Sequence, residues 1–157
     1  DGRVVCWGDT RLRQRNGTPT DDAYGSVACG FGHSVALHRD GRLVTWGGGA
    51  DVRAGAPTDA GYGAIACGAD HCVALDGVGR VVAWGDSYYG QRRDAPTDAG
   101  YVAIACGGTH SVVLRDDGRV VTWGNNRRNQ RRNAPTDAGY VAIACGLANS
   151  VALHEDG

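Results

Sequence analysis

The feature that most constrains this chain is an internal repeat of about 39 residues. Four tryptophans, each followed by glycine, recur at steps of 39, 38 and 39 residues: Trp7, Trp46, Trp84 and Trp123. The cysteine of a repeated ACG motif keeps the same period: Cys29, Cys67, Cys106 and Cys145. A tyrosine in DAGY or DAYG and a proline in PTD follow it too. A fixed period of this length indicates an array of equivalent supersecondary units, here four copies.

Each unit contains the short runs VAIACG, HSVVL and GRVVTWG, separated by segments such as GGT and RDDG. Valine and isoleucine favour strands, and the Asp-Gly pairs favour tight hairpin turns, so each unit predicts an antiparallel meander. The three runs are almost continuously apolar, which indicates that both faces of each sheet are covered. Small sheets covered by copies of themselves are typical of the blades of a β-propeller. We expect a fourth, outer strand from the charged segment after each WG, since charge suits a sheet edge.

The predicted fold is therefore an all-β propeller of four-stranded antiparallel blades, with four repeats per chain. Residues 1–157 form a single repeat domain in which one blade is split between the termini. Residues 1–26 supply the third and fourth strands of the split blade, and residues 143–157 supply its first two strands. The complete repeats are 27–65, 66–103 and 104–142.

Composition excludes several classes of protein. The chain has 26 glycines, four prolines and no methionine. It has no apolar run near the ~20 residues of a membrane-spanning helix and no signal-peptide pattern. We therefore expect no membrane association. It begins in mid-motif, and residues 93–107 and 132–146 are nearly identical. We interpret these features as a repeat segment, excised, recently duplicated or designed.

The pattern ACGxxHSVAL…DGRVVxWGxNxxGQ resembles the repeat of the regulator of chromosome condensation (RCC1) family. The repeat length is most similar to that of compact bacterial members, such as the propeller that inhibits β-lactamases. The resemblance implies a propeller that binds other proteins. Members that act in nucleotide exchange carry a long insertion that this chain lacks, so that activity is not implied. The GQ of the pattern is complete only at Gly90-Gln91.

One repeated position carries a histidine in three copies and an asparagine in the fourth: His33, His71, His110 and Asn149. A ring of imidazoles on a propeller axis could bind a metal ion if its nitrogens converged on one point. The asparagine and the adjacent tight turn instead favour a structural hydrogen-bonding role. We therefore predict no metal site and no cofactor.

The six cysteines allow two interpretations, a disulfide framework or free thiols. Equivalent cysteines in neighbouring blades would lie about a sheet-packing distance of ~10 Å apart, too far for a disulfide. We predict six free, buried thiols, which favours a reducing compartment such as the cytoplasm. Cys67 and Cys72 are the one pair that could face each other across a hairpin, so a bridge between them remains an alternative.

All 16 basic residues are arginines, and they concentrate in the segments after WG. The densest group is Arg127, Arg128, Arg131 and Arg132. Such a cluster could bind phosphates or nucleic acid. The net charge of −1 and the aspartate that follows each cluster favour a solvated, salt-bridged edge instead. Nucleic acid is therefore the less favoured partner.

No catalytic group is expected. Serine follows histidine in HS, but adjacent strand residues point to opposite faces, so nucleophile and base would not meet. The leading hypothesis is a non-enzymatic scaffold for another protein, with an enzyme and a propeller binding ligands or nucleic acid through the arginines as alternatives. The repeats differ most after CG, so we expect partner contacts there: Phe31, Asp70, Thr109 and Leu147.

The split blade raises the question of how the ring closes. Four blades must each turn about 90°, whereas an eight-bladed ring needs about 45° per blade, within the usual range of four to eight. Two chains could complete each other's split blade and remove the exposed strand edges. We predict a homodimer that forms one eight-bladed ring, with a closed four-bladed monomer as the alternative.

Overall fold

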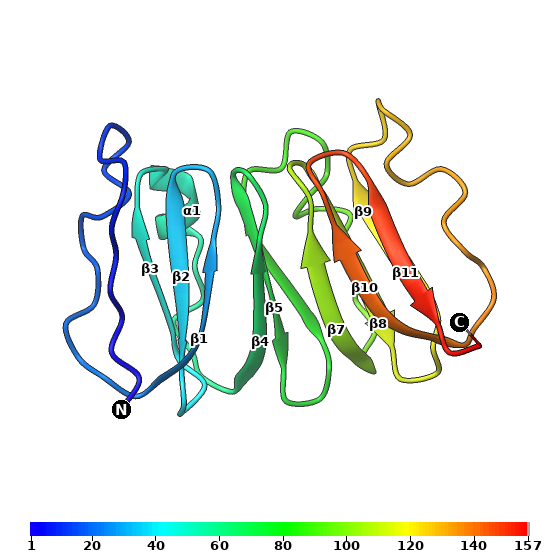
Figure 1. Ribbon diagram of the computed structural model, residues 1–157, viewed down its shortest axis with the longest axis horizontal. Helices are drawn as coiled ribbons and strands as arrows, with labels where there is room; N and C mark the ends of the chain where they lie inside the picture. The colour runs from blue at the N-terminus through cyan, green and yellow to red at the C-terminus, as the bar shows by residue number, and fades with distance from the viewer. Residues whose placement is uncertain (157) are drawn as a thin grey trace.

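The computed structural model describes residues 1–156, which form four antiparallel sheets in chain order (Figure 1). Three sheets have three strands and the last has two. The strands are β1 (Tyr24–Cys29), β2 (His33–His38), β3 (Leu43–Gly47), β4 (Tyr62–Cys67), β5 (His71–Asp76), β6 (Val81–Gly85), β7 (Tyr101–Cys106), β8 (His110–Arg115), β9 (Val120–Gly124), β10 (Tyr140–Cys145) and β11 (Ser150–His154). A short helix, α1 (Ala50–Ala54), follows β3. The prediction of an all-β fold is confirmed.

Local chemistry explains the hairpins. At the β5–β6 turn, the Asp76 carboxylate accepts the backbone N–H groups of Val78 and Arg80 at 3.0 and 2.8 Å. Gly79 adopts φ +75°, which glycine reaches without strain. The polar side chain and the glycine together reverse the chain, so the two apolar runs lie antiparallel in a single register.

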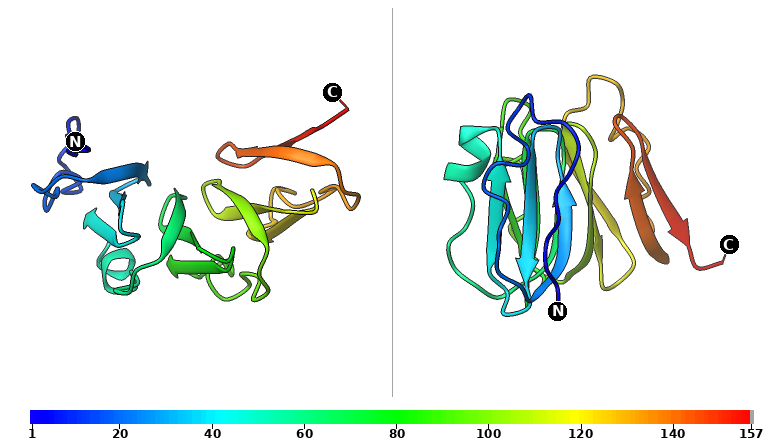
Figure 2. Two further views of the ribbon diagram at one scale, coloured as in Figure 1. Left: turned by 90° about the horizontal axis from the view of Figure 1, so that it is seen from below. Right: turned by 60° about the vertical axis from the view of Figure 1, so that its left-hand side comes forward.

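The four sheets stand side by side in an open arc, with the two termini at its opposite ends (Figure 2). Strands β1, β4, β7 and β10 contact one another in turn along the concave side. Hydrophobic cores lie between the first and second sheets and between the second and third. Between the second and third sheets, for example, Val73 and Leu75 pack against Tyr101, Val113 and Trp123. Each sheet thus depends on its neighbours for burial.

The prediction of four-stranded blades is wrong, because the segments after WG form turns, and after β3 the helix α1, rather than a fourth strand. Their backbone donors bond locally. The glutamine side chain in these segments accepts the N–H two residues before it, as Gln91 Oε1 does from Tyr89 at 2.8 Å and Gln130 Oε1 from Arg128 at 2.9 Å. Asn129 and Asn133 adopt positive φ. Because many backbone N–H groups of these segments are already hydrogen-bonded within the turns, few remain to pair with a neighbouring strand.

The prediction of a strand at GRVVCWG is also not met, because Arg3–Trp7 lies outside any sheet. The split-blade prediction assigns its pairing strand to the other end of the chain. Trp7 is 82% exposed. Val4 nevertheless packs against the first sheet, beside Tyr24 and Trp46. Among residues 1–156, no helix is long and apolar enough to cross a membrane.

Candidate functional site

The turns after CG meet at one edge of the arc, the upper edge in Figure 1. Backbone hydrogen bonds link them from sheet to sheet: Phe31 N–H to Ala69 O at 3.0 Å, Ala69 N–H to Gly108 O at 2.9 Å and Gly108 N–H to Leu147 O at 2.9 Å. These turns and the four repeated cysteines line a hollow of about 340 Å³. The edge is therefore a continuous, hydrogen-bonded rim around a hollow.

The four residues expected to contact a partner divide into two pairs. Phe31 and Leu147 are 73% and 76% exposed and line the hollow at the two ends of the rim. Asp70 and Thr109 instead anchor the segments that follow β6 and β9. Asp70 O accepts the N–H of Asp86 at 2.8 Å, and Thr109 Oγ1 accepts from Asn125 Nδ2 at 3.0 Å. The apolar pair is the stronger candidate for an interaction surface.

The arginine cluster lies at the same edge, on the outer side of the third sheet. The prediction of a salt-bridged edge is wrong for Arg127, Arg128, Arg131 and Arg132, because none of them has an ion pair within residues 1–156. The nearby Asp137 accepts the hydroxyl of Tyr140 at 3.3 Å instead. Arg127 lies over the ring of Tyr89, 5.1 Å from its centroid, and Arg131 donates to Gly124 O at 3.2 Å.

The repeated histidines bridge neighbouring sheets through the residue at the serine position. The contacts are His33 Nε2 to Cys72 Sγ at 3.0 Å, His71 Nε2 to Ser111 Oγ at 2.8 Å and His110 Nε2 to Ser150 Oγ at 2.9 Å. Within residues 1–156, the three imidazoles therefore do not share one ion site. The expectation that serine and histidine never meet is wrong, since it compared residues within one repeat and the contact joins two.

Burial makes these contacts structural. His71 and Ser111 are both 0% exposed, so no substrate reaches them. His71 Nδ1 has no hydrogen-bond partner, and hence nothing orients the ring as a catalytic base requires. Burial lowers the pKa of His71 to about 4. The imidazole ring is therefore neutral near pH 7, and its hydrogen bond to Ser111 links two neighbouring sheets.

Close packing explains the glycine of the CG motif. A Cβ on Gly68 would lie 2.1 Å from His71 Cε1, and one on Gly107 would lie equally close to His110 Cε1. Only glycine leaves room for the imidazole beside the turn. The repeated CG and HS motifs thus specify one inter-sheet contact.

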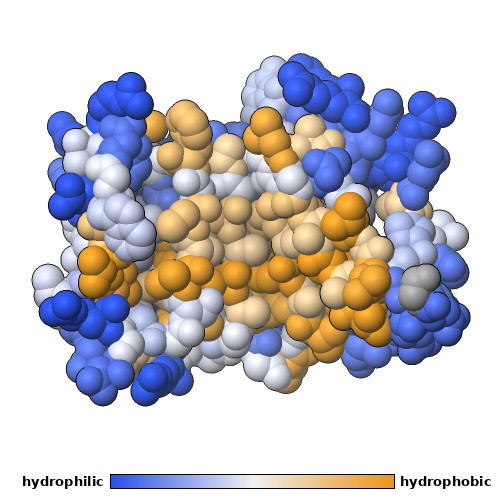
Figure 3. All heavy atoms as spheres, viewed as in Figure 1, coloured by the Kyte–Doolittle hydropathy of each residue, from blue (hydrophilic) through white to orange (hydrophobic). Residues whose placement is uncertain are grey.

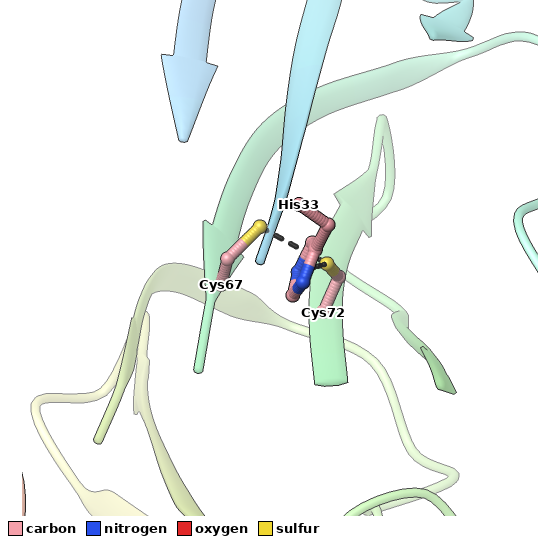
Figure 4. Close-up of side chains that lie close together, drawn as sticks. All are labelled: His33, Cys67 and Cys72. Carbon is pink, nitrogen blue, oxygen red and sulfur yellow. Dashed lines mark hydrogen bonds between the residues drawn. The ribbon is translucent and has the colours of Figure 1, made fainter. Parts of the chain in front are cut away.

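His33, Cys67 and Cys72 form a compact group between the first two sheets (Figure 4). Cys72 Sγ lies 3.0 Å from both His33 Nε2 and Cys67 Sγ. The hydrogen bond from Cys72 and the nearby His33 lower the pKa of Cys67, whereas burial raises the pKa of Cys72. Among residues 1–156, this is the one group of three histidine, cysteine or acidic residues whose ligand atoms all lie within 4.8 Å.

The cysteines are unpaired in the structure, but they are not uniformly buried. Cys72 is buried, Cys29 is exposed, and the others are intermediate: Cys6, Cys67, Cys106 and Cys145. Cys67, at the same repeat position, packs against the core between the first two sheets, whereas among residues 1–156 no sheet precedes the first one to cover Cys29. The expectation of six buried thiols is therefore met fully only at Cys72 and is wrong at Cys29.

Two further residue roles were not recognised in the sequence. Gln91 is 1% exposed, and its carbonyl accepts the indole N–H of Trp123 at 2.6 Å. The aspartate of PTD accepts the hydroxyl of the following tyrosine, as Asp98 does from Tyr101 at 2.7 Å. The fixed interval from PTD to tyrosine is the sequence signal that could have indicated the second contact. No pattern indicated the first.

Comparison with known proteins identifies the repeat. A family model described as the regulator of chromosome condensation (RCC1) repeat matches residues 26–51, 64–91 and 101–130, more than half of the chain. A search of curated proteins finds no significant match.

Several solved structures share the fold. Yeast RCC1 (Prp20), solved with Kap60 bound, is 22% identical with a TM-score of 0.70, over 88% of this chain and 44% of that one. Human WBSCR16 is 22% identical with a TM-score of 0.69, over 99% and 52%. The ectodomain of the Physcomitrella patens receptor kinase CR4 is 22% identical with a TM-score of 0.69, over 85% and 40%. The chain thus spans about half the length of the structures it matches.

Proposed function

Because this chain belongs to the RCC1 repeat family, we propose that it is a non-enzymatic, protein-binding propeller scaffold whose open ends join a second copy to complete a ring. The observation that carries the proposal is the exposure of end-sheet residues whose equivalents are buried in the middle of the arc. Yeast RCC1 (Prp20) is bound to Kap60 in one solved structure, and a second structural study describes its binding to Gsp1p and histones. A protein partner is therefore the class we assign here, with Phe31 and Leu147 on its contact surface.

The last sheet exposes the face that every other sheet buries. Val151 and Leu153 are 59% and 57% exposed, whereas Val73 and Leu75 at the same repeat positions are 0% and 4% exposed. Figure 3 shows apolar residues in a band across the concave side of the arc. The exposed face of the last sheet would be covered by a neighbouring sheet that presents a tyrosine, an alanine or valine, and a tryptophan, as the second and third sheets do.

The first sheet presents the complementary face. Tyr24, Ala36 and Trp46 form its apolar cluster, and Val4 packs against them as the equivalent Val81 packs against the third sheet. This packing supports a role for the N-terminal segment as the third strand of a preceding blade. Between this segment and β1 lies a cavity of about 270 Å³, lined by Val4, Tyr24 and Trp46 among others. The first two strands of that preceding blade would fill the cavity.

A second copy supplies those strands. Its two-stranded sheet β10–β11 would insert beside the N-terminal segment, whose sequence RVVCW matches RVVTW in and before β9. The rim would continue from Leu147 N–H to Phe31 O of the other copy, following the bonds within one chain. Asn149 would face Ser34, in place of the histidine–serine pairs. The chain covers 40 to 52% of the lengths of the matched propellers, so two copies provide enough blades for a ring.

Light scattering tests the assembly. We expect a mass of about 33 kDa, twice the 16.3 kDa of one chain. Leu153→Glu should return the mass to that of one chain, because a charge would enter the apolar interface. Val78→Glu is the matched control, since Val78 is 60% exposed in the β5–β6 turn and should leave the dimer intact. A wild-type chain that stays monomeric at every concentration would refute the ring.

Quantitative affinity capture tests the protein-binding surface. The bait is the wild-type chain beside a Phe31→Ser, Leu147→Ser double variant, after circular dichroism and light scattering have shown that the variant keeps the wild-type fold and mass. Partners retained by the wild type and lost by the variant would support the scaffold. Equal recovery by both baits would place binding elsewhere.

The unpaired arginines favour a second candidate function, binding of a polyanion. Arg127 and Arg128 are exposed and carry uncompensated charge. Phosphate contacts would make binding to a nucleic-acid probe fall steeply as salt rises. Titration of single-stranded RNA at two salt concentrations separates the candidates, since the protein scaffold predicts no such binding.

A further inference from the structure

Cys72 breaks the repeat in the second sheet. The other three sheets carry serine at its position: Ser34, Ser111 and Ser150. Cys72 places a second thiol opposite the repeated cysteine, because Cys67 and Cys72 lie opposite each other in the register of the antiparallel strands β4 and β5. The histidine of the preceding sheet, His33, reaches the same point. One substitution thus converts a repeated structural contact into a group of two thiols and an imidazole.

The repeat itself holds these three positions together. In the next copy, Ser111 Oγ lies 2.8 Å from His71 Nε2 and 3.6 Å from Cys106 Sγ. In the last copy, Ser150 Oγ lies 2.9 Å from His110 Nε2. The geometry therefore comes from the packing of neighbouring sheets and does not depend on the cysteine. The group at Cys72 is preorganised by the same fold.

We infer that Cys67 Sγ, Cys72 Sγ and His33 Nε2 form a binding site for a thiophilic divalent cation, Zn²⁺. Two cysteines and one histidine are a known three-ligand set for zinc, and thiolate ligands select soft or borderline metals over Ca²⁺ and Mg²⁺. No carboxylate belongs to the group. The chemistry of the donors thus identifies the class of ion.

The distances suit an ion at the centre of the group. All three ligand atoms lie within 4.8 Å of one another. With Zn–S bonds of about 2.3 Å and Zn–N bonds of about 2.0 Å, tetrahedral ligands lie roughly 3.5 to 3.8 Å apart. The two contacts of 3.0 Å would therefore lengthen by less than about 1 Å, which side-chain rotation can provide.

The site is buried on one side and open on the other. His33 and Cys72 are 2% and 0% exposed, whereas Cys67 lines the hollow of about 340 Å³ at the rim. The hollow gives the ion a route of entry. It also leaves room for a water molecule or another donor as the fourth ligand, as in zinc sites with three protein ligands.

Metal titration of the reduced full-length chain tests this inference. With a non-thiol reductant present, we expect one equivalent of Zn²⁺ to remain bound after desalting. Co²⁺ used as the probe should give the visible absorption of a tetrahedral thiolate site. Cys72→Ser restores the serine of the other repeats, so the fold should be kept. The affinity should nevertheless fall by at least about 100-fold, more than the loss of an outer-shell partner causes.

The repeat offers two matched variants. Cys106→Ser removes a repeated cysteine outside the group and should leave one equivalent bound. Ser111→Cys recreates the group between the second and third sheets and should raise the stoichiometry to two. Circular dichroism and light scattering establish that each variant keeps the wild-type fold and mass.

Three results would overturn the site. The first is a reduced wild-type chain that retains no Zn²⁺. The second is equal affinity in the wild type and Cys72→Ser, which would place the ion elsewhere. The third is a Cys67–Cys72 disulfide that persists under the reducing conditions, shown by a mass lower by two hydrogens.

Discussion

The two sheets in the middle of the arc and the two ends of the chain have nearly the same sequence but different environments. Trp84 is 1% exposed and Trp7 is 82% exposed, although both follow a valine-rich run and precede glycine. Repeat proteins are stabilised by the intrinsic stability of each unit and by the interfaces between units. The difference shows that a blade of this chain obtains its core from its neighbours. The ends lack that contribution.

The histidine–serine hydrogen bonds also differ between the middle of the arc and its ends. His71 Nε2 and His110 Nε2 each meet a serine of the next sheet, while Asn149 at the last copy has no next sheet within the chain. The open end thus differs in hydrogen bonding as well as in apolar burial. Comparing equivalent positions in the two regions separates the effect of the sequence from that of the neighbours.

The largest expected effect is at the tryptophan position. In the monomeric Leu153→Glu background, Trp84→Ala should lower the free energy of unfolding by ~3–5 kcal/mol, because it removes a fully buried indole. Trp7→Ala in the same background should cost less than about 0.5 kcal/mol. Denaturant unfolding measures both. Equal losses of unfolding free energy in the two variants would show that the middle sheets and the chain ends are buried to the same extent.

Acid should destabilise the middle of the arc through His71. Its pKa is lowered by burial to about 4 in the folded chain, below the ordinary value of 6.5. The unfolded chain therefore binds the proton more readily, and stability present above pH 6.5 is lost as the pH falls toward 4. The loss is about 2–3 kcal/mol.

The control for the acid effect is His71→Asn, which places the residue of the last copy at this position. Its unfolding free energy should depend less steeply on pH between 6.5 and 4. A variant with the wild-type pH profile would show that His71 does not carry the effect.

The valine position tests apolar burial alone. In the monomeric background, Val73→Ala should cost about 2 kcal/mol, since the methyl groups it removes are fully buried between two sheets. Val151→Ala should cost less than about 0.5 kcal/mol, because that side chain is 59% exposed. Thermal or denaturant melts compare the two. A larger loss at Val151 would mean that the last sheet is covered in the single chain.

The smallest effect is expected at the tyrosine position. Tyr101 donates to Asp98 at 2.7 Å and is 4% exposed, so Tyr101→Phe should cost about 1 kcal/mol. Tyr140 donates to Asp137 at 3.3 Å in an exposed setting, and Tyr140→Phe should be nearly neutral. A double-mutant cycle with Asp98→Ala isolates the hydrogen bond. No coupling in that cycle would assign the loss to packing.

Much of the fold could be predicted from the sequence because it depends on local pattern. The runs VAIACG and HSVVL became strands, and the Asp-Gly pairs became turns, since both reflect short-range preferences. The fourth strand could not be excluded in this way. Its absence depends on Gln91 and Gln130, whose side chains satisfy backbone donors within the turns.

The candidate sites were less predictable because they join residues from different repeats. Cys67 and Cys72 were recognised as a facing pair, but His33 lies in the preceding unit, 39 positions from Cys72. The histidine–serine contacts span 40 positions and were missed for the same reason. Comparison of the repeats identifies residues at equivalent positions, but it does not identify residues of different repeats that lie in contact.

The sequence alone therefore determined the repeat, its strands and its turns, because these follow from side-chain preferences and hydrogen bonds within a few residues. The tertiary structure decided which copies are buried, which arginines have no ion pair within residues 1–156, and which thiols meet an imidazole. Those properties arise between sheets, where each blade supplies the surface that its neighbour lacks. Identical motifs consequently acquire different roles according to whether a neighbouring blade is present.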